Sequence, residues 1–103
     1  MNRTLLLAAL LLAAASPGAQ AQSADANLGR MLASNCANCH GTNGNSVGGM
    51  PGLAGRARAE MLQTLREYRD GKRPATIMQQ LAKGYTDAQL DAVSAYLSAQ
   101  KPN

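Results

Sequence analysis

The stretch Ser34–Gly44, "SNCANCHGTNG", contains both cysteines and the only histidine of this 103-residue chain. Cys36 and Cys39 are three positions apart, and His40 follows directly. On a helical turn, residues three apart lie on the same side. The most reactive side chains of the protein therefore share one short segment, which indicates that they share one chemical role.

Three ordinary roles for such a cluster fit poorly. A redox dithiol begins a helix beside a βαβ unit, but residues 22–103 hold only seven β-branched residues, too few to predict strands. A structural zinc site needs four ligands, and the chain offers three. A disulfide between Cys36 and Cys39 would close too small a loop to add much stability, and it would leave His40 without a role.

Covalent haem attachment uses all three residues. Each thiol can form a thioether with one vinyl group of the porphyrin, and the histidine that follows can act as the proximal iron ligand. We therefore expect one haem c, bound through Cys36 and Cys39, with His40 on the iron.

The second axial ligand must come from a methionine, because there is no other histidine. Met31 and Met61 fall at helical spacing, which is typical of core residues. Met50 adjoins Pro51 and lies close in sequence to the proximal side. Met78 follows an irregular segment that could pass around the haem, so the sequence favours Met78, with Met50 as the alternative.

The first 21 residues have the pattern of an export signal. Arg3 is followed by the apolar run Leu5–Ala15 and by the small-residue motif that ends at Ala21. That run, about 11 residues long, is too short to span a bilayer, which takes roughly 20. We expect a signal peptide at 1–21 and a single mature domain at 22–103, located in the periplasm and without a membrane span.

The composition of the mature domain agrees with a bound cofactor. The chain has three Tyr and no Trp or Phe, and domains of this size usually need a metal, disulfide or cofactor to complete the core. The shortage of aromatic residues also argues against binding of single-stranded nucleic acid. Basic residues gather between Arg56 and Arg73; they could steer an acidic partner, but we interpret them as a solvated helix face with an Arg56–Glu60 pair.

Helical patterns recur along the mature chain. The last helix is the best marked, because Thr86 and Gln89 form a capping box ahead of an apolar stripe. Two irregular stretches, Gly41–Gly55 and Gly71–Thr76, are long enough to wrap a cofactor. The expected helices are Ala24–Ala37, Ala57–Arg69, Met78–Lys83 and a final one with its apolar stripe at Leu90, Val93, Tyr96 and Leu97.

Four motifs resemble those of class I cytochromes c: "CANCHGTNGNS", "MPGLAG", "YRDGKRPATIM" and "YTDAQLDAVSAYL". The resemblance extends from Ala24 to Gln100. It implies an all-α fold of three main helices, with short helical pieces and loops wrapped around one covalently bound haem.

The resemblance also implies roles for particular residues. The carbonyl of Pro51 would accept a hydrogen bond from the proximal imidazole of His40, and Met78 would be the distal ligand. The first and last helices would cross closely, with the neighbourhood of Gly29 against Val93 and Tyr96.

Within this family, "GNSVGGMPGLAG" and "RPATIMQQLAKGYTD" are most similar to the haem subunit of flavocytochrome c sulfide dehydrogenase, in its single-haem form. This likeness implies an electron-transfer subunit without catalysis of its own, and an FAD-containing partner subunit. The alternative is a free soluble carrier of the cytochrome c4 or c553 type that serves a terminal oxidase or peroxidase.

Overall fold

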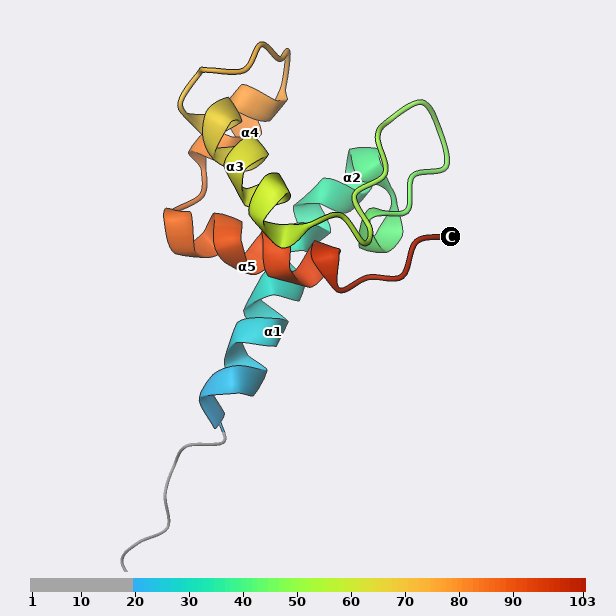
Figure 1. Ribbon diagram of the computed structural model, residues 1–103, viewed down its shortest axis with the longest axis vertical. Coiled ribbons are helices and arrows are strands. Elements are labelled where there is room, and N and C mark those ends of the chain that lie inside the picture. The colour runs from blue at the N-terminus through green and yellow to red at the C-terminus, as the bar shows by residue number, and fades with distance from the viewer. Residues whose placement is uncertain (1–19) are drawn as a thin grey trace, which may run out of the picture.

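The computed structural model describes residues 20–103, with side chains from residue 26 onward (Figure 1). All regular elements in that range are helical, which confirms the all-α prediction. The α-helices are α1 (Gln20–Ala33), α2 (Ala37–His40), α3 (Arg58–Arg69), α4 (Met78–Lys83) and α5 (Asp87–Ser98), and the 3-10 turns are η1 (Ser34–Cys36) and η2 (Thr42–Gly44).

The expected signal peptide, residues 1–21, lies almost entirely outside the described residues. Within residues 20–103, no helix combines the length and the apolar character needed to cross a membrane.

Helices α1 and α5 cross at Gly29 (Figure 1). A Cβ atom placed on Gly29 would lie 3.1 Å from Cβ of Tyr96, and closer still to the backbone of Ala92. The predicted crossing of the first and last helices is confirmed, with Ala92 and Tyr96 as the residues that face Gly29. The absence of a side chain at Gly29 allows this close approach.

The buried face of α1 differs from the expected one. Leu28 and Met31 are 41% and 69% exposed, whereas Gly29 and Ala33 are buried. Gly29 and Ala33 are four residues apart and so lie on one face, and the close crossing selects this small-residue face. The prediction that Met31 is a core residue is therefore wrong, while the same prediction for Met61, which is 6% exposed, is confirmed.

Helix α5 begins as its sequence predicts. The hydroxyl of Thr86 accepts a hydrogen bond from the backbone N–H of Gln89 at 3.2 Å, and the Gln89 side chain accepts one from the Thr86 N–H at 2.9 Å. The apolar stripe that follows is buried, since Leu90, Val93 and Leu97 are at most 3% exposed. Two of these residues, Val93 and Leu97, form one core cluster with Ala33 and Met61.

The basic residues of α3 hold this helix to α5. The predicted Arg56–Glu60 pair is not formed. Instead, the guanidinium of Arg58 donates two hydrogen bonds to the Asp91 carboxylate, at 2.9 and 2.7 Å. Asp87, in the first turn of α5, accepts from two further arginines of α3, Arg66 at 3.2 Å and Arg69 at 2.7 Å. Much of the basic segment therefore supports the fold.

Candidate functional site

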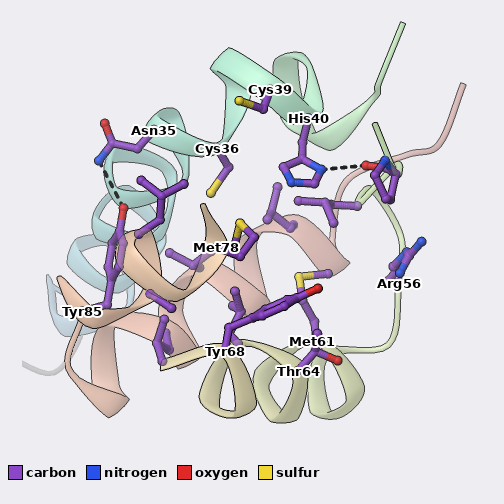
Figure 2. A pocket seen from close by; sticks show the side chains of 18 of the residues that line it. Asn35, Cys36, Cys39, His40, Arg56, Met61, Thr64, Tyr68, Met78 and Tyr85 are labelled. Atoms are coloured by element: carbon purple, nitrogen blue, oxygen red, sulfur yellow. Dashed lines mark hydrogen bonds between the residues drawn. The ribbon is translucent and has the colours of Figure 1, made fainter. Parts of the chain in front are cut away.

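A cavity of about 390 Å³ lies between α2, α3, α4 and α5 (Figure 2). Every residue that the sequence predicts for the cofactor site lines it, although these residues come from separate segments of the chain. They are Cys36, Cys39, His40, Pro51 and Met78.

The two cysteines face this cavity from one turn of the chain. Cys36 ends the 3-10 turn after α1 and is partly buried, while Cys39 lies three residues later in α2 and is exposed. No disulfide joins them, so both sulfurs are available for attachment. Two thiols on one turn at the edge of one cavity can both reach the same bound molecule.

His40 ends α2, is buried, and points into the cavity (Figure 2). Its Nδ1 atom lies 2.7 Å from the carbonyl oxygen of Pro51. Because a carbonyl can only accept a hydrogen bond, Nδ1 carries the proton in this contact. In the neutral ring the other nitrogen, Nε2, then keeps its lone pair and is free to bind a metal.

Glycines shape the loop that brings Pro51 to His40. Gly41 has φ of 82°, a conformation that favours glycine, and a Cβ atom there would lie 2.0 Å from the backbone oxygen of Asn45. The carbonyl of Gly44 accepts hydrogen bonds from the N–H groups of Leu53 at 2.8 Å and Ala54 at 3.1 Å. The loop therefore returns to its own start, and Pro51 lies two residues before the point where it closes.

Three of the four methionines that could supply the distal ligand line the cavity: Met50, Met61 and Met78. Met31 does not. Met78 is the first residue of α4 and is partly buried, and Figure 2 shows its sulfur between Cys36 and Tyr68. Met50, which is 41% exposed, adjoins Pro51 on the histidine side.

Two tyrosines that the sequence did not assign to the site also line the cavity. The Tyr85 hydroxyl donates to the backbone oxygen of Leu32 and accepts from the Asn35 amide at 3.1 Å. The guanidinium carbon of Arg73 lies over the Tyr68 ring, 5.7 Å from the ring centroid. Helical spacing with the other cavity residues of α3 could have placed Tyr68 at the site, but Tyr85 precedes α5 and carries no periodic signal.

These residues fit a planar apolar cofactor. The volume is typical of ligand pockets, and no buried side-chain nitrogen or oxygen in the described part of the chain lacks a hydrogen-bond partner.

Across residues 20–103, no group of three His, Cys, Asp or Glu side chains could hold a metal ion alone. A metal ligated by His40 would therefore have to bring most of its ligands with it, as porphyrin iron does. The apolar part of the lining includes Met61, Leu65, Leu90, Val93 and Leu97.

Comparison with known proteins identifies the family. The sequence model described as cytochrome c matches residues 26–101, which include the whole cavity. A search of the curated proteins found no match. Members of the matched family bind haem c covalently through a Cys pair and transfer electrons, and Cys36 and Cys39 have the spacing of that pair. The chain belongs to the cytochrome c family.

Proposed function

We propose that this cytochrome is a periplasmic carrier of single electrons in which His40 and Met78 are the two axial ligands. The observation that carries this proposal is the 2.7 Å contact between Nδ1 of His40 and the carbonyl of Pro51, directly beside the two cysteines. It leaves Nε2 as the ligating atom. When bound, haem supplies a couple between ferric and ferrous iron.

The protein side chains would tune and protect this couple. Donation from His40 to Pro51 orients the ring and raises its basicity. A thioether from Met78 favours the reduced iron more than a second imidazole would. Leu90 and Val93, both buried in the cavity wall, exclude water from the interior. If His40 and Met78 both hold the iron, no ligand position would remain for a substrate, so the proposed role is electron transfer without bond chemistry.

Partners would approach where apolar side chains are both exposed and part of the cavity wall. Met50, Ile77 and Leu81 are 41 to 52% exposed and line the cavity. Electrons could pass there to or from a partner by outer-sphere transfer.

The proposed donor is the flavin-containing subunit of a sulfide dehydrogenase. Its support is the resemblance of residues 44–55, "GNSVGGMPGLAG", and 73–87, "RPATIMQQLAKGYTD", to the haem subunit of that enzyme. The alternative partner is a terminal oxidase or peroxidase served by a free carrier.

The proposed location rests on the N-terminal sequence. Cleavage after Ala21 would release a mature domain of residues 22–103, and attachment of haem c takes place outside the cytoplasm in bacteria. The mass of the exported protein tests both points, because it reports the new N-terminus and one covalently added haem.

Visible absorption spectra of the oxidised and reduced protein test the ligands. We expect the weak far-red band of sulfur on ferric iron, and no binding of carbon monoxide by the reduced protein. Met78→Ala should remove the band and admit carbon monoxide. Met50→Ala is the matched control and should change neither. Loss of the band in Met50→Ala instead would assign the distal role to Met50.

The partner is tested by reduction kinetics. The oxidised cytochrome is mixed with a sulfide-oxidising flavoprotein and sulfide, and in parallel reduced cytochrome is mixed with a terminal oxidase. Fast reduction by the flavoprotein, together with co-purification, supports the sulfide dehydrogenase assignment. Rapid turnover with the oxidase alone would favour the free carrier.

A further inference from the structure

We propose that Asn45 is a positioning residue for the proximal histidine. Its side chain makes two hydrogen bonds that join the loop after His40 to residues 101–103. These two bonds, together called the tie, hold the Pro51 carbonyl against the imidazole of His40. The inference rests on the proposed role of His40 as an iron ligand.

Both ends of the Asn45 amide are used. Its Nδ2 group donates to the carbonyl oxygen of Lys101 at 3.1 Å, and its Oδ1 atom accepts from the backbone N–H of Asn103 at 2.8 Å. The donor end meets an acceptor and the acceptor end meets a donor, so the amide orientation is set by its partners. One side chain thus makes two hydrogen bonds to a segment that lies 56 to 58 positions away in sequence.

Asn45 lies where the two ends of the loop that carries Pro51 come together. We call this point, formed by residues 44, 45 and 53, the neck of the loop. The N–H of Asn45 donates to the carbonyl of Thr42 at 3.1 Å, and the preceding Gly44 carbonyl receives the N–H of Leu53 at 2.8 Å. Residues 45 and 53 are therefore the two fixed ends of a short loop. Pro51 lies inside it, close to the second end.

Few contacts hold this loop between its ends. Val47 is 98% exposed, and a Cβ atom on Gly48 or Gly49 would meet nothing within 4 Å. The contacts between the Ser46 hydroxyl and Gly48 are 3.4 and 3.5 Å long, at the limit for hydrogen bonds. The position of the Pro51 carbonyl consequently depends on the neck.

Residues 101–103, to which Asn45 binds, pack in turn against the rest of the fold. Pro102 packs against Gly55, where a Cβ atom would lie 2.8 Å from the proline ring. The N–H of Gly55 donates to the carbonyl of Leu97 in α5 at 3.0 Å. Asn45 therefore connects the loop to a supported segment, and the connection can transmit the rigidity of α5 to Pro51.

Removal of the tie has a predictable effect on the iron. A looser neck lets the Pro51 carbonyl move away from Nδ1 of His40, which weakens a hydrogen bond that raises the basicity of the imidazole. A less basic ligand stabilises ferric iron less, so the reduction potential should rise. The Nδ1 proton should also exchange with solvent faster, because the local contact opens more often.

The test compares Asn45→Ala and Asn45→Asp with the native holoprotein. NMR of the reduced protein gives the exchange rate of the His40 Nδ1 proton, and a redox titration gives the potential. We expect Asn45→Ala to raise the exchange rate about tenfold or more, which corresponds to about 1.4 kcal/mol in the opening equilibrium, and to raise the potential. Asn45→Asp keeps the acceptor for Asn103 but loses the donor to Lys101, so its exchange rate should rise less; its potential is not compared, because the added negative charge itself favours ferric iron.

Asn27→Ala is the matched control, because Asn27 is exposed in α1 and belongs neither to the loop nor to the cavity wall. It should change neither quantity. If the Asn45 variants fold and lose stability while the exchange rate and the potential stay at native values, Asn45 is only structural and the inference is overturned. If the native protein lacks haem-shifted ring signals from His40, the proposed ligation fails instead.

Discussion

The hydroxyl of Tyr85 donates a hydrogen bond to the backbone oxygen of Leu32, 3.3 Å away, and so joins the segment before α5 to the last turn of α1. The last four carbonyls of a helix have no partner within it, and Leu32 carries one of these. The same hydroxyl accepts from Asn35, next to the attachment site.

Tyr85→Phe should therefore lower the free energy of unfolding by about 1 kcal/mol, the usual net value of a part-buried hydrogen bond. Urea unfolding of the holoprotein measures this. Tyr68→Phe is the control, because the Tyr68 hydroxyl makes no hydrogen bond to another side chain or backbone group in the described residues. Equal losses in the two variants would show that the contact with Leu32 contributes nothing specific.

Gly29→Ala should destabilise the protein by about 1 to 3 kcal/mol, the typical cost of overpacking. The added Cβ would lie 2.6 Å from the carbonyl oxygen of Ala92, and backbone atoms cannot move aside as a flexible side chain can. Gly48→Ala is the comparison, since the new methyl group would meet no atom within 4 Å. It should leave stability unchanged or raise it by up to about 1 kcal/mol. Thermal unfolding of both variants decides whether the crossing needs glycine.

Acid should weaken the contact between α3 and α5. The hydrogen bond from Arg69 lowers the pKa of Asp87, and the one from Arg58 lowers the pKa of Asp91. A carboxylate with a lowered pKa stabilises the fold above its unfolded pKa, and this contribution disappears as pH falls through the folded pKa. Stability should therefore decline below about pH 4, where free aspartates titrate.

Asp87→Asn should flatten this acid decline, and salt at about 1 M should reduce it in the native protein because the pairs are exposed and screened. Urea titrations across the acid range, from about pH 3 to neutral, measure the slope. An unchanged slope in Asp87→Asn would assign the acid sensitivity to other carboxylates.

The features that could be predicted from the sequence are those encoded by neighbouring residues. The capping box at Thr86 and Gln89 is a local pattern, and so is the spacing of Cys36, Cys39 and His40. Short-range geometry fixes both, whatever the rest of the chain does. The helix boundaries shift by a few residues, as for α1, which ends at Ala33 and is followed by a 3-10 turn.

The features that could not be predicted join residues far apart in sequence. Periodicity showed that the first helix has an apolar side with Leu28 and Met31, but the crossing with α5 buries the small face at Gly29 instead. Likewise, Arg58 has Asp91 as its partner 33 positions away. Which partner is nearest depends on how the helices pack, and no local pattern carries that information.

Without haem, the protein should lose its cooperative fold. The cavity of about 390 Å³ reaches the buried side chains of Leu90, Val93 and Leu97. Without haem these apolar side chains would face water or unfilled space, and a small domain has only about 5 to 15 kcal/mol of stability with which to offset that loss.

The double variant Cys36→Ala, Cys39→Ala, isolated free of haem, should therefore retain little near-UV circular dichroism and show no sharp thermal transition. Cys39→Ala alone keeps one thiol for attachment and should still unfold cooperatively. A haem-free double variant that melts cooperatively, with a midpoint close to that of the native protein, would show that the cavity walls support one another without the cofactor.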